Sequence, residues 1–298
     1  MSEQATASGA RGNPVALRGA LWMGGALLSF CVMAVAVREL LRTLGSFEIL
    51  FLRSLVSLML VLAVLPRFGL RALRTRLIGL HVIRNVFHFG GQYAWVYAIG
   101  MLPLATVFAI EFTMPVWTAV LAALILGERL NRGRAVMLAL GLAGILIILK
   151  PGFERVPPAA LVMLAGSFAY ASTMIATKRL AGNDTAFAVL FYMSAIQVPL
   201  GLIPALPGWV TPGLAELPWI IAVGASGLSA HFCLTRSLRL ADVTLVVPID
   251  FLRLPLIAAV GMVLYGEPLE FSILLGAAVI FAGTYYSIRR ESRAPEGP

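Results

Sequence analysis

Two acidic residues stand deep inside long apolar runs of this chain, where an ionised carboxylate is costly. Glu111 lies eight residues into the run 103–126, and Asp250 lies eight residues into the run 242–265. A helix rises about 1.5 Å per residue, so each acid is about 12 Å from one end of its run. The hydrocarbon core of a bilayer is about 30 Å thick. Because charged groups at such depth mark pathways for substrates or protons, we expect both acids to line a transport site near the midplane.

A stripe of polar side chains crosses a third apolar run, 77–100. His81, Arg84, His88 and Gln92 recur at intervals of three, four and four residues, which places them on one helix face. A polar face on an apolar helix is expected to point at a cavity or a polar partner. In the internal repeat described below, Gln92 corresponds to His231, so this face is polar in both copies.

Two interpretations of these charges remain open. Arg253 follows Asp250 by three residues and can pair with it on one helix face. In the first interpretation, the pairs Asp250–Arg253 and Arg84–Glu111 only neutralise each other and hold the protein together. In the second, Arg84 and Arg253 bind substrate carboxylates, while Glu111 or Asp250 binds an amine or carries a proton. His88 would then relay protons, because the pKa of a free imidazole lies near neutrality.

Three further residues within the apolar runs have less specific roles. Arg53 lies nearer the outer face, and we expect it to be structural and to extend its charged end to the interface. Pro115 and Pro248 lie beside the two acids, and each removes a backbone donor and can kink its helix. Static packing and a mobile gate explain these kinks equally well.

The elements that must position these residues follow from composition. The chain of 298 residues is 60% hydrophobic and 12% charged, whereas soluble proteins carry about 25% charged residues. The bilayer is therefore the expected solvent, and a spanning helix needs about 20 apolar residues. We predict an all-α polytopic membrane protein with ten spans: 17–37, 47–66, 77–100, 103–126, 134–149, 158–177, 185–206, 218–238, 242–265 and 271–288.

The distribution of basic residues predicts the orientation. With the N-terminus in the cytoplasm, 16 Lys and Arg residues fall on the cytoplasmic side and 4 on the other side. This bias predicts that both termini are cytoplasmic. The net charge of +9 is explained in the same way, and we expect no nucleic-acid partner.

The chain also repeats itself. At an offset of 139 residues, Ile110, Phe112, Ala119, Gly127, Glu128 and Leu130 recur as Ile249, Phe251, Ala258, Gly266, Glu267 and Leu269. Five spans per half is an odd number, so the two halves enter the membrane from opposite faces as inverted repeats, which is typical of alternating-access carriers. We divide the chain into a disordered N-terminus (1–16), two five-helix repeats (17–150 and 158–288) and a cytoplasmic tail (289–298). Glu128 and Glu267, at span ends, are each expected to have a basic or amide partner.

Other kinds of site find little support. Cys31 and Cys233 lie in apolar runs and resemble small core residues. No phosphate-binding Gly-Lys-Ser/Thr loop and no metal-ligand spacing occurs, so we expect no cofactor. The segment Gly224–Gly227 matches a rhomboid-protease serine motif, but no histidine follows on a later helix, and we do not expect an enzyme. The run 17–37 is long enough to span, so we do not expect it to be a cleaved signal peptide.

These features together resemble the EamA type of the drug/metabolite transporter superfamily. The most typical stretches are Glu111–Pro115, Gly127–Leu130 and Lys150–Gly152, within a resemblance that covers residues 17–288. The resemblance implies a central cavity between the first four helices of each half, and it carries no universal site motif.

We therefore expect a secondary transporter in the bacterial inner membrane. Its substrate would be a small polar metabolite, amino-acid-like, zwitterionic or anionic, with coupling to protons or exchange and with export slightly favoured. The alternative is a flippase for a lipid-linked substrate, or a membrane-embedded enzyme, on the same scaffold. A flippase needs a groove open to lipid, and a receptor or assembly subunit needs no cavity.

Overall fold

The computed structural model describes residues 14–127, 131–150 and 156–292, and the regular structure within them is helical. The helices of the first half are α1 (Pro14–Leu40), α2 (Ser46–Phe68), α3 (Ile78–Met101), α4 (Leu104–Glu111), α5 (Met114–Leu126) and α6 (Arg132–Leu149). Those of the second half are α7 (Pro158–Ala181), α8 (Ala186–Ala205), α9 (Leu217–Leu240), α10 (Val243–Phe251), α11 (Arg253–Tyr265) and α12 (Phe271–Glu291). Two short 3₁₀ turns, Leu70–Leu73 and Leu206–Gly208, lie in connections.

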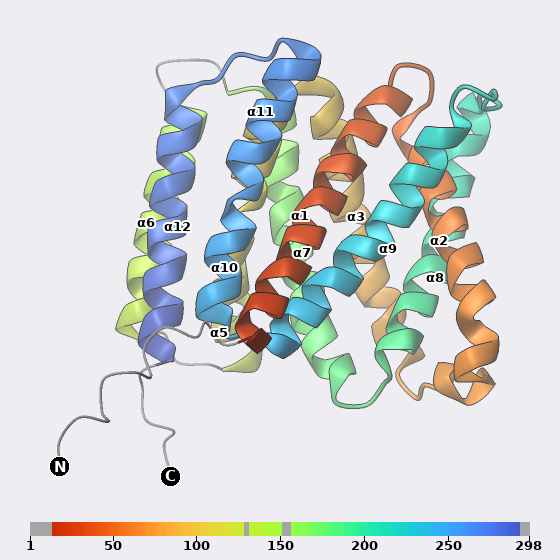
Figure 1. Cartoon of the computed structure of the whole chain (residues 1–298), viewed down its shortest axis with the longest axis horizontal. Coiled ribbons are helices and arrows are strands. Elements are labelled where there is room, and N and C mark those ends of the chain that lie inside the picture. The colour runs from red at the N-terminus through yellow and green to blue at the C-terminus, as the bar shows by residue number, and fades with distance from the viewer. Residues whose placement is uncertain (1–13, 128–130, 151–155, 293–298) are drawn as a thin grey trace, which may run out of the picture.

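The twelve α-helices make ten crossings, because α4 with α5 and α10 with α11 each form one broken span. Helix α1 begins and α12 ends at the same end of the bundle, which is the lower end in Figure 1. The predicted all-α fold with ten transmembrane helices is therefore confirmed. Helix α1 begins at Pro14 and α12 continues to Glu291, so both helices extend beyond the repeat boundaries that we drew; residues 1–13 and 293–298 lie outside the described part.

Nine of the ten crossings, within the described residues, are apolar enough to count as candidate membrane spans by composition alone. The tenth is α3, whose 24 residues are long enough to cross. It carries the polar stripe, including His81, Arg84, His88 and Gln92, and these side chains are buried against other helices. The exception therefore marks the helix whose polar face must be covered by protein.

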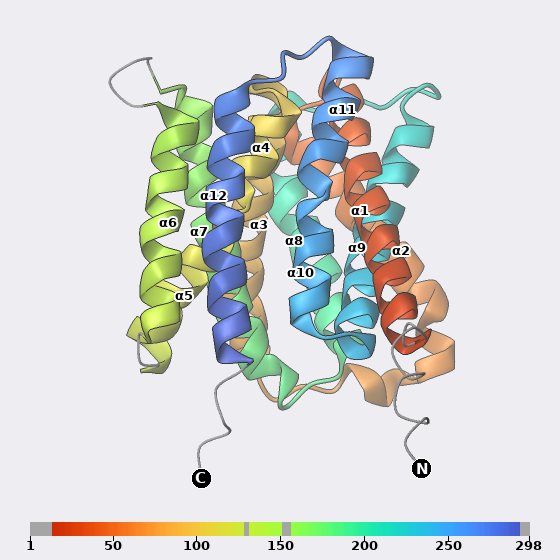
Figure 2. The ribbon, with the colours of Figure 1, turned by 60° about the vertical axis from the view of Figure 1, so that its left-hand side comes forward.

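The two halves are inverted and interlocked. In Figure 1, α1 leads upward from the lower end, whereas α7, the first helix of the second half, leads downward from the upper end. The most extensive helix pairs each take one helix from each half: α1 with α9, α7 with α3, α2 with α8, and α6 with α12. In Figure 2, α6 and α12 lie side by side at one side of the bundle. Each half therefore completes the other.

Small residues let these helices approach closely. A Cβ built on Gly144 of α6 would lie 2.6 Å from the carbonyl oxygen of Gly276, and one built on Gly276 of α12 would lie 2.7 Å from that of Gly144. The two backbones are thus in direct contact, as is common where membrane helices associate through small residues. Any side chain at either position would push the pair apart.

The apolar core is concentrated in the upper half of the bundle. Its largest buried cluster takes in the second half of α1, the second half of α3, most of α4 and the first half of α11. The lower half holds two smaller clusters, one around Met23 and Val246 and one around Leu121 and Ala171. The helices are therefore sealed together at the end opposite the start of α1 and less tightly packed at the other.

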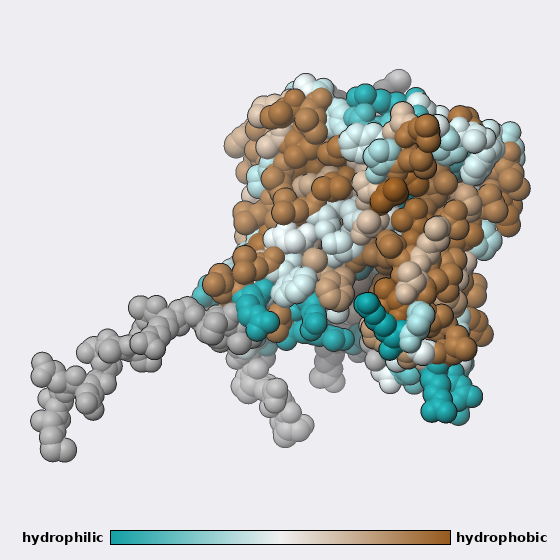
Figure 3. Space-filling model, turned by 45° about the vertical axis from the view of Figure 1, so that its right-hand side comes forward, coloured by the Kyte–Doolittle hydropathy of each residue, from teal (hydrophilic) through white to brown (hydrophobic). Residues whose placement is uncertain are grey.

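The outer surface suits a lipid environment. Figure 3 shows apolar residues over much of the side of the bundle, with hydrophilic residues gathered toward its two ends. Large exposed apolar side chains include Leu28 on α1, Leu124 on α5 and Val263 on α11. Such a belt would be unstable in water and is stable against acyl chains.

Candidate substrate-binding site

The first acid stands at a break in its helix. Glu111 is the last residue of α4, and α5 begins three residues later at Met114. Pro115 has no N–H to donate to the Glu111 carbonyl. The Ile110 carbonyl accepts hydrogen bonds from the hydroxyls of Thr113 (2.7 Å) and Ser167 (3.0 Å). Side chains thus stabilise the break, as a helix interrupted within a membrane requires.

The second acid stands at the equivalent break of the other half. Asp250 is next to last in α10, which is separated from α11 by the single residue Leu252. Pro248, which we expected to be able to kink this span, lies inside α10, so the break itself comes four residues later, at Leu252. The break is followed instead by Pro255, which cannot donate to the carbonyl of Phe251.

The two breaks meet, and one arginine joins them. The rings of Phe112 and Phe251 stack with their centroids 4.2 Å apart. The Arg253 Nη2 lies 3.2 Å from Glu111 Oε1, and its Nε lies 3.7 Å from Asp250 Oδ1. The predicted Asp250–Arg253 contact is present. The predicted Arg84–Glu111 pair is not, since Glu111 pairs with Arg253 from the other half.

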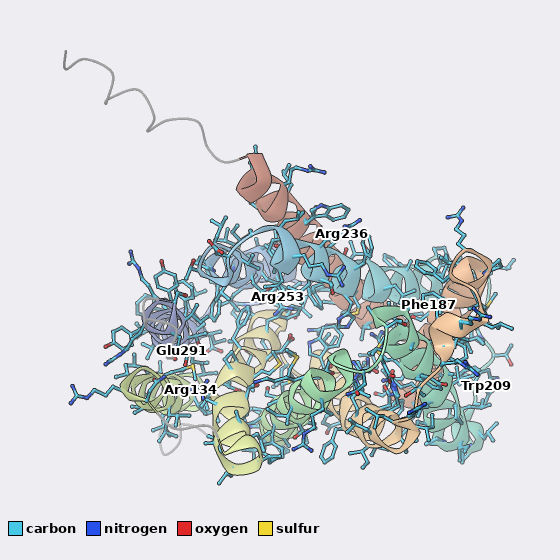
Figure 4. The ribbon with its side chains drawn as sticks, turned by 90° about the horizontal axis from the view of Figure 1, so that it is seen from below. Arg134, Phe187, Trp209, Arg236, Arg253 and Glu291 are labelled. Carbon is cyan, nitrogen blue, oxygen red and sulfur yellow. The ribbon has the colours of Figure 1, made fainter. Side chains whose placement is uncertain are left out.

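Aromatic rings surround this charge cluster. The Arg253 guanidinium lies 4.4 Å from the ring centre of Phe30, 5.0 Å from that of Phe112 and 5.2 Å from that of Phe108. Such cation–π contacts are strong when water is excluded. The Trp95 indole donates a hydrogen bond of 2.9 Å to Glu111 Oε2. Viewed from below in Figure 4, Arg253 lies well inside the ring of helices, while Arg134 and Trp209 lie toward opposite ends of the long axis.

The side chains of the polar stripe on α3 contact two different regions of the second half. The His88 ring nitrogen Nδ1 lies 2.8 Å from Gln197 Nε2 on α8. Arg84 donates to Asn85 Oδ1 (2.9 Å) and to the Thr177 hydroxyl (3.2 Å). His81 instead lies 2.7 Å from Asp184 in the connection between α7 and α8, at the lower end. His81 therefore belongs to a contact between the α7–α8 connection and α3.

The remaining predicted residues complete the middle of the bundle. The His231 ring of α9 lies 6.2 Å from that of His88 and 6.4 Å from that of Phe30, centre to centre. Although its neighbours are interior, His231 is only partly buried. Gln92 is 5% exposed, and its Oε1 has no hydrogen-bond partner among the described residues. An unsatisfied amide therefore lies one helical turn from His88, and the neighbouring imidazole of His231 keeps part of its surface exposed.

A second ion pair joins the helices at the upper end. Glu267 Oε1 lies 2.6 Å from Arg38 Nη2, and Glu267 Oε2 accepts a 2.7 Å hydrogen bond from the first backbone N–H of α4, at Leu104. Glu267 thus has the basic partner that we expected. The corresponding Glu128 lies outside the described residues. A recess of about 520 Å³, lined in part by Arg42 and Tyr97, opens beside this contact.

Several residues of this region escaped the sequence analysis. Trp95, Tyr170 and Gln197 were not assigned to the site, although Trp95 donates to Glu111, the Tyr170 ring lies 5.7 Å from that of His88, and Gln197 contacts His88. An isolated aromatic or amide residue in an apolar run carries no signal of what it faces; Gln92 was recognised because it continues a polar stripe. Arg53 was expected to reach the outer interface, but it is 7% exposed and lies between α2 and α9. The only feature of the sequence that pointed to Arg53 was a charge within an apolar run. Such a charge costs free energy in the membrane and therefore marks a residue with a function.

Comparisons with known proteins agree with this architecture. The chain is 27% identical over 278 residues to an S-adenosylmethionine uptake transporter of Rickettsia prowazekii, covering 93% of this chain and 95% of that protein. It is 29% identical over 286 residues to a riboflavin transporter of Rhizobium johnstonii, covering 95% of each. It is 25% identical over 257 residues to the pseudopaline exporter CntI of Pseudomonas aeruginosa, covering 86% of this chain and 90% of that protein.

A solved structure described as "Crystal structure of protein" superimposes with a TM-score of 0.64. It is 18% identical and covers 93% of this chain and 99% of that one, which shows a shared fold. The model of the EamA-like transporter family matches the chain twice, over residues 17–150 and 157–289. Two inverted five-helix halves, each with a helix broken beside a partly exposed acid, are thus explained by common descent: the chain is a multi-pass membrane transporter of small metabolites and belongs to the EamA-like transporter family of the drug/metabolite transporter superfamily.

Proposed function

We propose that this protein is a secondary carrier that moves a small zwitterionic or anionic metabolite across the bacterial inner membrane by alternating access. The observation that carries the proposal is the cluster of Glu111, Asp250 and Arg253. These three groups join the two helix breaks across the repeat boundary, so a change in their pairing moves both halves. Discontinuous helices at the interface of inverted repeats are where such carriers place their binding sites.

The packing supports one conformational state. The upper end is closed by the large apolar core and by the Arg38–Glu267 pair, while the lower half is held by smaller clusters. With both termini in the cytoplasm, as the basic residues predict, this is the state in which the central site faces inward. The opposite state would require the seal at Glu267 to open and a contact such as His81–Asp184 to close the lower end.

The site chemistry suits a substrate with charges of both signs. Carboxylates at Glu111 and Asp250 outnumber the single guanidinium of Arg253, which leaves capacity for an amine or a proton. Rings at Phe30 and Phe251 offer apolar and cation–π surface beside them. Two of the relatives are named as transporters of S-adenosylmethionine and of riboflavin. Both metabolites contain aromatic rings, which is consistent with aromatic side chains in the lining of the site.

Transport in proteoliposomes tests the proposal. We expect saturable counterflow of labelled S-adenosylmethionine, which carries a carboxylate and an ammonium group, abolished by Glu111→Gln, because the amide keeps the shape but not the charge that holds Arg253. Glu291→Gln, at the exposed end of α12, is the matched control and should transport normally. Full activity of Glu111→Gln would refute a central role for this acid.

The direction of transport is tested with the same vesicles. Export, which we favoured from the sequence, stays a prediction, and the relatives include both an uptake transporter and an exporter. Vesicles loaded with substrate and given a proton gradient of either sign would show which gradient drives movement. Equal rates under both gradients would indicate exchange without proton coupling.

A further inference from the structure

The charged side chains at mid-depth carry one more positive than negative charge, and two of the three arginines have no acidic partner in the part of the chain that the structure describes. The interior of the bundle holds Arg53, Arg84 and Arg253 together with Glu111 and Asp250. Arg253 forms ion pairs with both acids. Neither Arg53 nor Arg84 has a carboxylate within ion-pair distance among the described residues. A buried charge without a partner costs several kcal/mol, so the pair of guanidinium groups needs another explanation.

The Arg53 side chain packs against α9, but its hydrogen-bonding groups are not all satisfied. It is 7% exposed, and its Nε has no hydrogen-bond partner within the described part of the chain. Its guanidinium lies against α9 at Gly227, where an added Cβ would stand 3.1 Å from Nη2 and 3.2 Å from Nε. A glycine at this position leaves room for the planar group, which reaches across from α2 into the middle of the bundle.

Arg84 has neutral partners only. It is 6% exposed and donates to the Asn85 amide oxygen and the Thr177 hydroxyl. A guanidinium has five N–H donors, so several remain for a ligand. The hydrogen bonds fix the orientation of the group and leave its charge uncompensated.

The two groups lie near one pair of imidazoles. Gly227, which touches Arg53, precedes His231 by one helical turn, and Arg84 precedes His88 by one turn. The rings of His231 and His88 are 6.2 Å apart. The arginines therefore flank one pair of imidazoles, at the partly exposed face of His231.

We propose that Arg53 and Arg84 form an oxyanion subsite that binds the carboxylate or phosphate group of the transported metabolite. This inference rests on the proposed carrier function and revises its details, because Arg253 is occupied by Glu111 and Asp250 and does not receive the anion. A guanidinium fork matches either oxyanion with paired hydrogen bonds. A substrate with one anionic group here also cancels the single excess positive charge of the interior.

The test measures anion binding on the full-length protein in lipid nanodiscs. Thermal unfolding is followed against inorganic phosphate and, separately, against acetate at constant ionic strength. We expect saturable stabilisation of the wild type, because a ligand that binds only the folded state raises its stability. Stronger stabilisation by phosphate would identify a phosphate-bearing substrate, and stronger stabilisation by acetate a carboxylate.

Two substitutions locate the subsite. Arg53→Met and Arg84→Met should each weaken the apparent affinity for the stabilising anion by about tenfold or more, since each removes charge-assisted hydrogen bonds. Arg289→Met, which removes an exposed arginine on α12, should keep the wild-type response. Without anion, Arg53→Met should unfold at the same or a higher temperature than the wild type, because it removes an uncompensated charge.

The outcomes separate this inference from the carrier function. Absence of saturable stabilisation in the wild type, or an unchanged anion response in Arg53→Met, overturns the subsite. If counterflow remains sensitive to Glu111→Gln in that case, the carrier proposal stands alone. Anion binding that depends on Arg53, without transport of any substrate, would instead support the subsite and overturn the carrier.

Discussion

At the scale of residues, each charge in the interior has a different environment, and the environment determines its role. Arg253 is 4% exposed, stacked among aromatic rings and placed between two acids. Glu111 is bound by Trp95 and Arg253 together. Through these contacts, Arg253 of the second half is bound directly to Glu111 of the first half.

Substitution of Arg253 should separate charge from shape. Arg253→Met leaves Glu111 and Asp250 facing each other without a cation, and loss of one partner of a buried pair costs about 3–5 kcal/mol. Arg253→Lys keeps the charge but loses the planar stacking on Phe30 and Phe112. We therefore expect a large drop in unfolding temperature for the first and a folded protein with slow counterflow for the second. Equal stability of the Met variant and the wild type would contradict the pairing.

At the scale of elements, the broken helices are the central feature. Hydropathy predicted one continuous span over 103–126 and another over 242–265, and both spans do cross. Proline near the acids indicated where the helices could kink; a break does lie beside Pro115, whereas in the other half it follows Pro248 by four residues, at Leu252. A proline's missing donor is visible in a sequence, but whether a distant side chain such as Ser167 bonds to a carbonyl at the break, here that of Ile110, depends on a helix far along the chain.

The glycine contacts between α6 and α12 supply a prediction about stability. Gly144→Ala places a methyl group 2.6 Å from the Gly276 carbonyl, and such overpacking costs about 1–3 kcal/mol. Gly90→Ala is the matched control, because no atom lies within 4 Å of a Cβ at that position in helix α3. There we expect a neutral or slightly stabilising effect, since alanine favours helix by about 1 kcal/mol. Thermal unfolding in one detergent compares the two; a more stable Gly144→Ala would contradict the close packing.

At the scale of the whole molecule, interlocking makes the inverted halves a single unit. Because each principal helix pair combines both halves, neither can move without sliding against the other. The Arg38–Glu267 pair at the upper end and contacts such as His81–Asp184 at the lower end then stabilise opposite conformational states. A carrier needs both states within a few kcal/mol of each other, so that substrate or a proton can shift the balance.

Weakening the upper seal should shift this balance. Glu267→Gln loses the ion pair to Arg38 and weakens the hydrogen bond to the start of α4, interactions worth about 1–3 kcal/mol. Spin labels at Thr43 and Leu269, both exposed near the upper end, should report longer separations in this variant by electron–electron resonance. Glu291→Gln should leave the distances unchanged. Identical distance distributions in Glu267→Gln and the wild type would argue against a gate at Glu267.

The orientation in the membrane is also open to a direct measurement. A fluorescent reporter that folds only in the cytoplasm, fused to the C-terminus, should be bright, because the predicted topology puts 16 of the basic residues outside the spans on the side of the C-terminus and 4 on the other. Alkaline phosphatase, which is active only outside the cytoplasm, should be inactive at the same position. A bright phosphatase signal would reverse the topology and with it the inward-facing assignment.

The sequence by itself determined the membrane environment, the ten crossings, the inverted repeat and the presence of charge at mid-depth. These properties follow from local composition, from spacing and from the cost of charge in hydrocarbon, which act within single helices. Only the tertiary structure decided which charges pair. Glu111 is far from Arg253 in the chain but bonded to it in space, and Arg53 faces Gly227 instead of the interface. Pairing depends on where distant helices meet, and that is settled by packing of the two halves together.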